Sequence, residues 1–132
     1  MKTIEFSVRT SRKEEWVDIT RLIDAELAKM KTAGGLCHIF VSHTTAGITI
    51  NENADPDVME DLFGALARMV PRSGYRHAEG NSEAHIKASL VGSAATIALQ
   101  EGELQLGRWQ GIYLCEFDGP RTRSIRLTVI EG

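Results

Sequence analysis

The stretch Leu36-Cys37-His38-Ile39-Phe40-Val41-Ser42 is a short, almost uninterrupted apolar run, and a polar segment starting at His43 follows it directly. A run of this length is typical of a strand that other layers cover on both faces. We therefore expect residues 36–42 to form a strand with a packed layer on each side.

Periodic patterns on both sides of this run predict the other elements. Ile4, Phe6 and Val8 alternate with polar residues, as in a half-buried strand, and apolar residues recur at helical spacing over residues 19–30. Gly34-Gly35 is expected to end that helix. The same patterns predict helices from Asp55-Pro56-Asp57 to Pro71 and from Asn81 to Gly92, and strands over 48–51, 95–99, 103–106, 109–117 and 122–130. This order indicates an α+β fold with mixed or antiparallel sheets and about three helices.

Length and composition limit the class of protein. The 132 residues suit a single domain over 1–132, and 42% hydrophobic with 25% charged residues is typical of a globular protein. The net charge of -3 argues against a nucleic-acid partner. No apolar run reaches the length of a membrane span, and residues 1–10 lack the pattern of a signal peptide. We expect a cytoplasmic protein without a membrane partner, in which Cys37 and Cys115 are reduced, buried thiols.

Three histidines are candidate metal ligands, since each lies at the end of a predicted element. Strand alternation places His43 in phase with Ile39 and Val41, His77 lies in a polar segment, and His85 lies one turn into a helix. Neutral imidazoles from three element ends can converge on one cation and leave a coordination position open. The alternative is three unrelated histidines that lie at the surface or form ordinary hydrogen bonds.

A second candidate cluster surrounds the Gly119-Pro120 turn. Alternation puts Glu116 and Asp118 on the apolar side of their strand, and buried carboxylates need partners, for which Arg121 and Arg123 are well placed. The cluster is either a structural salt-bridged turn or an anion clamp, because a guanidinium matches phosphate oxygens.

Two further segments allow contact with a ligand. Thr44 and Thr45 are small hydroxyl residues beside His43 and favour a close backbone approach, although they also suit an ordinary turn. Trp109 either stacks on a heterocycle or packs within a sheet. The nucleophile elbow Gly-x-Ser-x-Gly and the glycine-rich nucleotide loops are absent from the sequence.

Together, three blocks of sequence resemble the YjbQ family. They are His43-Thr44-Thr45-Ala46-Gly47 through Asp55-Pro56-Asp57, Tyr75-x-His77 through Ala84-His85, and Leu106-Gly107-x-Trp109-Gln110 through Asp118-Gly119-Pro120-Arg121-x-Arg123. They follow the family's order over about two-thirds of the chain. The resemblance implies the YjbQ-like α+β fold, a homotrimer, and a pocket built from the three histidines.

The resemblance also implies roles for individual residues. The metal ligands would be His43, His77 and His85; the catalytic groups Glu116, Asp118 and Arg121; and the substrate-binding groups Asn81, Trp109, Arg121, Thr44 and Thr45. Cys37 is a weaker candidate. Arg108 stands where the family pattern leads us to expect a small residue, usually Thr.

The family is described as one of secondary thiamine-phosphate synthases, which join a pyrimidine diphosphate to a thiazole phosphate and release pyrophosphate. The resemblance therefore implies an enzyme with a small phosphorylated substrate and a divalent metal. Three imidazoles suit zinc better than magnesium, which prefers oxygen ligands. Two alternatives stay open: a zinc-dependent hydrolase, and a non-catalytic trimer that binds a metal or a phosphorylated metabolite.

Overall fold

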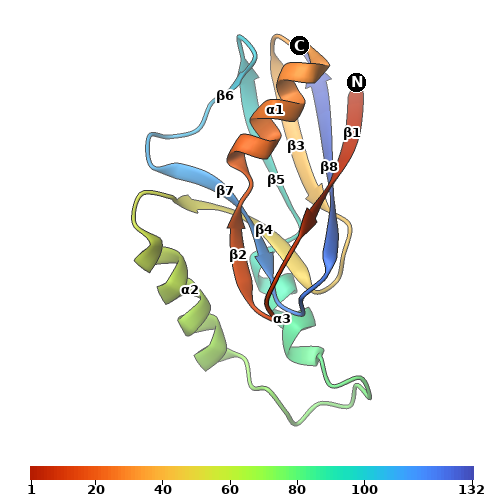
Figure 1. The fold of residues 1–132 in the computed structure, drawn as a ribbon, viewed down its shortest axis with the longest axis vertical. Helices are drawn as coiled ribbons and strands as arrows, with labels where there is room; N and C mark the ends of the chain where they lie inside the picture. Colours follow the sequence, from red (N-terminus) through yellow and green to blue (C-terminus); the bar gives the residue numbers. More distant parts are fainter.

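The computed structural model describes residues 1–132 and consists of two antiparallel sheets and three helices (Figure 1). The strands are β1 (Lys2–Arg9), β2 (Glu15–Asp18), β3 (Gly35–Val41), β4 (Ala46–Glu52), β5 (Ala94–Gln100), β6 (Glu103–Leu104), β7 (Gln110–Glu116) and β8 (Thr122–Glu131). The helices are α1 (Thr20–Met30), α2 (Pro56–Met69) and α3 (Ser82–Val91). The predicted α+β class and the number of helices are confirmed, and no helix has both the length and the apolar character that crossing a membrane requires.

The two sheets have different sizes and orders. The larger sheet has the order β1-β8-β3-β5-β6, and the smaller one has the order β2-β7-β4. The two ends of the chain are paired, because Lys2 on β1 lies opposite Val129 on β8. In Figure 1 both termini lie at one end of the molecule, and α3 lies at the other.

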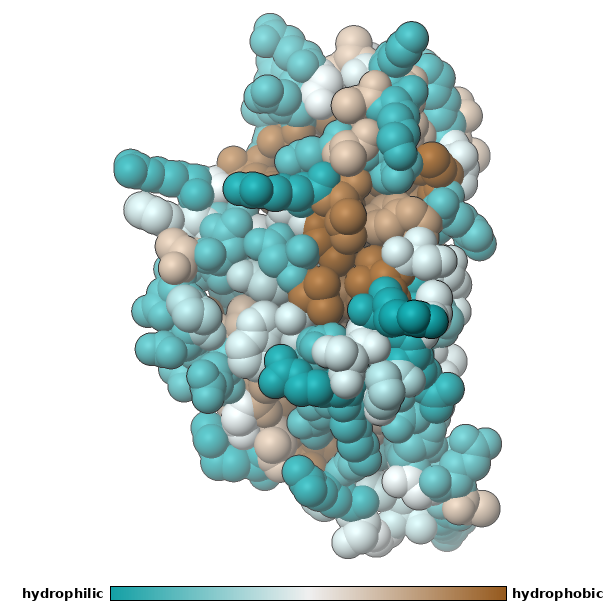
Figure 2. Space-filling view, viewed as in Figure 1, coloured by the Kyte–Doolittle hydropathy of each residue, from teal (hydrophilic) through white to brown (hydrophobic).

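Two apolar cores lie on the two faces of the smaller sheet. On β7, Ile112 and Leu114 point into the first core, which also contains inward side chains of the larger sheet and of α1. Tyr113 and Cys115 point the other way, into a second core formed with α2 and α3. Strand β7 is therefore buried on both faces, which explains its nearly continuous apolar sequence. Apolar residues reach the surface in the middle of the face shown in Figure 2, where hydrophilic residues surround them.

The prediction that both faces of the 36–42 strand are covered is wrong for the isolated chain. Cys37 and Ile39 on β3 are fully buried, but Leu36 on the opposite face is 47% exposed. The reason is that β3 belongs to the larger sheet, whose outer face no element of this chain covers. The strand covered on both faces is β7.

Smaller differences concern the ends of elements. The first helix ends at Lys31, in a left-handed conformation whose N–H donates to the Leu27 carbonyl, before Gly34-Gly35 is reached. The short strand β2 was not predicted, and the predicted 103–106 strand is only two residues long. The start of α2 is confirmed, since the Asp55 side chain caps it by accepting a hydrogen bond from the Asp57 N–H.

A buried ion pair joins the two sheets at the end of the first core. Glu116 of β7 is fully buried and pairs with Arg123 of β8, whose side chain is 2% exposed. Arg123 Nε donates to Glu116 Oε1 at 2.9 Å, and Arg123 Nη2 donates to the Thr45 hydroxyl at 2.9 Å. The Thr10 hydroxyl donates to Glu116 Oε1 at 2.7 Å. The salt-bridged turn, one of the two sequence-based alternatives, is therefore present.

We expect the Arg123→Met variant to be less stable than the parent protein by about 3–5 kcal/mol, because it leaves the Glu116 carboxylate buried and unpaired. The matched control is Lys29→Met, which removes the pair that exposed Lys29 forms with Glu26 on α1 and should cost about 1 kcal/mol or less. Urea unfolding of the variants at equal protein concentration measures both effects. Equal unfolding midpoints would contradict the structural role of the pair.

Candidate functional site

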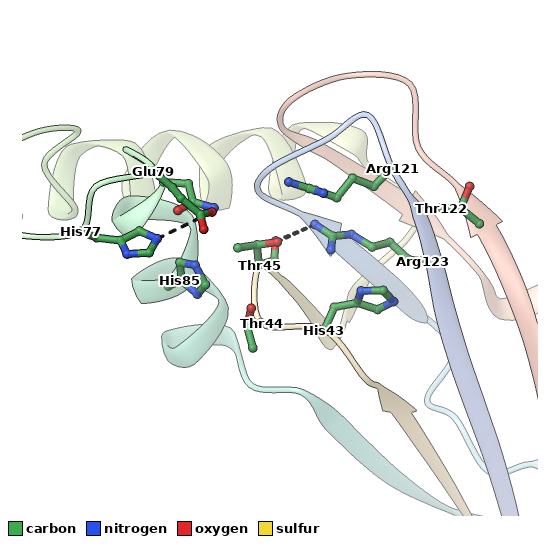
Figure 3. A pocket seen from close by; sticks show the side chains of 10 residues that line it. His43, Thr44, Thr45, His77, Glu79, His85, Arg121, Thr122 and Arg123 are labelled. Carbon is green, nitrogen blue, oxygen red and sulfur yellow. Dashed lines mark hydrogen bonds and ion pairs between the residues drawn. The ribbon is translucent and has the colours of Figure 1, made fainter.

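A pocket of about 620 Å³ lies at the end of the molecule that carries α3, and none of its lining residues is hydrophobic (Figure 3). We call it the polar pocket. Three segments line it: residues 43–45, residues 77–85 of the α2–α3 connection and α3, and residues 121–123 at the start of β8. The lining residues are His43, Thr44, Thr45, His77, Glu79, Asn81, His85, Arg121, Thr122 and Arg123.

His77 and His85 lie next to each other on one side of the polar pocket. Their ring centroids are 5.6 Å apart and the rings are nearly perpendicular, at 86°. Two imidazoles on one tetrahedral zinc ion, with Zn–N bonds of about 2.0–2.1 Å, have centroids roughly 5 Å apart. The centroid separation of the pair is close to this value, and we therefore keep His77 and His85 as candidate cation ligands. No group of three His, Cys, Asp or Glu side chains is arranged as a complete metal site.

His43 lies across the polar pocket from this pair, next to β8 (Figure 3). Its Nε2 accepts a hydrogen bond from the backbone N–H of Ser124 at 2.9 Å. Burial, followed by the positive charges of Arg123 and Arg121, lowers the pKa of His43 below its usual value, although Glu116 acts in the opposite direction. The structure thus brings all three predicted histidines to one pocket, but not around one point.

Arg121 is the guanidinium that the polar pocket offers to a ligand, since its side chain is 53% exposed. Its Nη2 donates to Asp118 Oδ2 at 3.0 Å and its Nε to the Asp118 carbonyl at 2.8 Å. Asn81 Nδ2 donates to the same Asp118 oxygen at 3.0 Å. Burial raises the pKa of Asp118, but the hydrogen bonds from Asn81 and Arg121 outweigh it and leave the pKa below its usual value. Asp118 is therefore an anion that orients Arg121.

Other predicted site residues lie apart from the polar pocket. Glu116 is fully buried behind Arg123 and does not line it. Trp109 is 55% exposed beneath Arg108, whose guanidinium carbon is 4.8 Å from the ring centroid. Trp109 precedes β7, whereas the pocket lies at the other end of that seven-residue strand, roughly 23 Å away. The Cys37 thiol is buried in the first core, and burial raises its pKa to about 11.

Two lining residues, Glu79 and Thr122, were not predicted from the sequence. Glu79 Oε2 lies 3.9 Å from His77 Nε2, and Thr122 follows Arg121 at the start of β8. Both lie next to predicted site residues in the sequence, Glu79 near His77 and Thr122 beside Arg121. This proximity is the feature of the sequence that could have identified them. Arg123, predicted as a partner of a carboxylate, also lines the pocket.

Comparison with known proteins places the chain in a family. The family model described as UPF0047 protein YjbQ-like matches residues 4–132. The chain belongs to the YjbQ family. A UPF0047 protein of Methanocaldococcus jannaschii is 47% identical over 96% of this chain and 92% of its own length, and YugU of Bacillus subtilis is 47% identical over 94% of each chain. The family predicted from the sequence motifs is confirmed.

Solved structures of YjbQ proteins share this fold. A protein of the YjbQ/UPF0047 family from Clostridium acetobutylicum is 50% identical, with a TM-score of 0.92 over 96% of this chain and 99% of that chain. A YjbQ-like protein of unknown function from Sulfolobus solfataricus is 33% identical, with a TM-score of 0.93 over 99% and 97% of the two chains. The α+β arrangement is therefore that of the YjbQ family.

The lowered pKa of His43 predicts that its ring stays neutral where an exposed histidine, with a pKa of about 6.5, becomes protonated. NMR titration of the imidazoles should give His43 a midpoint below 6.5, with its signal assigned from the His43→Asn variant. Because the folded state then binds fewer protons than the unfolded state, His43 should also make the protein lose stability as the pH falls through about 6.5. A midpoint above 6.5 would contradict the prediction.

Proposed function

We propose that this chain is an enzyme that acts on a small phosphorylated molecule and binds its phosphate group in the polar pocket. The observation that carries the proposal is the lining itself, which has no hydrophobic residue. It combines an exposed guanidinium and three imidazoles with hydroxyl and amide groups, against a single carboxylate, that of Glu79. Such a lining suits an anion with many acceptor oxygens better than an apolar ligand.

Within this pocket, Arg121 would bind the phosphate, because Asp118 holds its side chain in position and more than half of that side chain is exposed. A guanidinium binds phosphate oxygens through two donors at once. Thr44, which is exposed, would add a hydroxyl donor. Arg123 would contribute little, since it donates to Glu116 and Thr45 and the Glu116 carboxylate balances its charge.

A divalent cation, preferably zinc, fits the His77 and His85 pair, and phosphate oxygens or water would complete its coordination. When bound, the cation would stabilise negative charge that develops on the phosphate. Magnesium fits less well, because it prefers oxygen ligands. Side chains of the protein itself would transfer protons and orient the substrate. Arg121 is placed to neutralise the negative charge of a departing anion.

The candidate reaction is a transfer of the thiamine-phosphate synthase type, in which a pyrimidine joins a thiazole phosphate and pyrophosphate leaves. A second pocket of about 420 Å³ supports it, because His77 and His85 line this pocket as well, together with Tyr75 and Ile86. Tyr75 could contact the pyrimidine there. Trp109 cannot do so within one chain, because it lies at the opposite end of β7.

Hydrolysis at a zinc-bound site and binding without turnover are the competing functions. Purified protein with zinc or magnesium, given the pyrimidine diphosphate and the thiazole phosphate, distinguishes them. Thiamine phosphate formation that the His85→Ala variant lacks would support the transfer. Free phosphate or pyrophosphate without the joined product would support a hydrolase, and tight binding without any product would support the non-catalytic alternative.

We further propose that the chain acts as a homotrimer that covers the outer face of the larger sheet. Leu36 and Ile130 are direct cross-strand partners on this face and are 47% and 50% exposed. Phe40 lies on the same face, with the Arg126 guanidinium 5.9 Å from its ring centroid. Adjacent exposed apolar side chains on a sheet are typical of a surface that associates with a partner.

The Leu36→Glu variant should prevent this association, because burying a carboxylate in an apolar contact is costly. The matched control is Leu22→Glu, since Leu22 is similarly exposed, at 46%, but lies on α1. Light scattering should give three times the 14.5 kDa chain mass for the parent and the control, and the single-chain mass for Leu36→Glu. A monomeric parent protein would disprove the trimer.

The Arg121→Ala variant should bind pyrophosphate about 10–100-fold more weakly than the parent protein, because hydrogen bonds to a charged group contribute about 1.5–3 kcal/mol. Isothermal titration calorimetry measures the change. Arg108→Ala is the control, since Arg108 stacks on Trp109 away from the polar pocket and its loss should leave the affinity unchanged. Equal affinities of the two variants would remove Arg121 from the proposed site.

A further inference from the structure

The His43 ring is held in one orientation by the backbone of β8. Pairing between β3 and β8 ends at Val41 and Ile125, and Ser124 is the next residue along β8 beyond this pairing. The Ser124 N–H donates to His43 Nε2 at 2.9 Å, so the imidazole continues the hydrogen bonding between the two strands by one step. A backbone N–H can only donate, and therefore Nε2 must be the ring nitrogen without a proton.

This hydrogen bond fixes which nitrogen carries the proton in the neutral ring. With Nε2 unprotonated, the single proton lies on Nδ1. A metal ion needs a free lone pair on a ring nitrogen, but the Nε2 lone pair accepts from Ser124 and Nδ1 is occupied by its proton. To become a ligand through Nε2, His43 would have to release the Ser124 N–H, which is part-buried.

The Nδ1–H group has no hydrogen-bond partner within the chain, whereas His43 itself lines the polar pocket. Burial and then the nearby Arg123 and Arg121 charges lower the pKa of the ring against the effect of Glu116, so the ring stays neutral near pH 7. A neutral imidazole that the backbone holds in place donates a hydrogen bond to an oxyanion without giving up its proton.

We propose that His43 binds an oxygen of the substrate's phosphate group as a neutral hydrogen-bond donor through Nδ1–H, and that it is not a ligand of a metal ion. The identity of the anion rests on the proposed function. The assignment of the ring does not, because it follows from the Ser124 hydrogen bond. The three predicted metal ligands are thereby divided into a pair that suits a cation, His77 and His85, and a donor that faces them.

Nitrogen NMR of protein labelled with ¹⁵N-histidine tests the assignment without any substrate. At pH 7.5 the His43 signals should show a protonated Nδ1 and an unprotonated Nε2, and zinc chloride should leave the Nε2 signal in place. The opposite tautomer, or a zinc-induced shift of either His43 nitrogen to the position of a metal-bound one, would overturn the proposal.

Two substitutions test the roles of the two ring nitrogens of His43 separately. The amide nitrogen of His43→Asn occupies about the place of Nδ1, whereas the amide oxygen of His43→Gln reaches about the place of Nε2 and can accept from Ser124. We expect pyrophosphate affinity within about threefold of the parent for His43→Asn and at least tenfold weaker for His43→Gln. Zinc binding, measured by competition with a chelator, should be the same in both variants as in the parent.

The results also separate this inference from the proposed function. If both variants lose zinc, or if His43→Gln binds pyrophosphate as the parent does, the role assigned to His43 is wrong. A parent protein that binds neither pyrophosphate nor the thiazole phosphate would instead contradict the proposed function, and the NMR result would still decide how His43 is protonated.

Discussion

The ion pair between Glu116 and Arg123 connects the two sheets at the point where the apolar core gives way to the polar pocket. It attaches the end of β7 to the start of β8, and through Thr45 it attaches the segment that carries His43. Two of the three segments that line the pocket are therefore fixed to one buried contact. A buried ion pair rarely adds more stability than an apolar contact would. The pair instead determines where the two arginine side chains lie. It holds Arg123 in the interior, whereas the guanidinium of Arg121 stays exposed at the polar pocket.

Much of the fold could be predicted from local patterns, and the misses have a common cause. The Asp55 cap and the alternation along β8 are local features, and they were sufficient to predict the start of α2 and the strand β8. Whether a strand is covered on one face or two depends on where it lies in the tertiary structure. The apolar run on β3 therefore resembled a doubly covered strand, although β7 is the one between two cores. The four residues of β2 have too short a pattern to be noticed, and β2 is a strand because it pairs with β7.

In the candidate site, too, some features could be predicted from the sequence and others could not. Their positions at the ends of predicted elements, together with the family resemblance, brought His43, His77 and His85 into one hypothesis, and the structure places all three along one pocket. The sequence could not show how each ring is hydrogen-bonded. The partner of His43 is a backbone N–H that lies 81 residues away along the chain, and no periodicity reports such a contact. Likewise, the carboxylates of the Gly-Pro turn could be placed on the apolar side, but only the packed structure distinguishes a buried Glu116 from an Asp118 that orients Arg121.

The pairing of β1 with β8 has a practical consequence for protein engineering. Lys2 Nζ lies 3.5 Å from Glu131 Oε1, so a short linker can join the two ends of the chain. The ten residues of β8 place this junction roughly 30 Å from the start of that strand, where Arg121 and Thr122 lie. New ends could then be opened in the exposed turn at Glu101-Gly102, between β5 and β6. Circularly permuted chains, or fusions made at the original ends, would therefore leave the end of the molecule that carries the polar pocket unchanged.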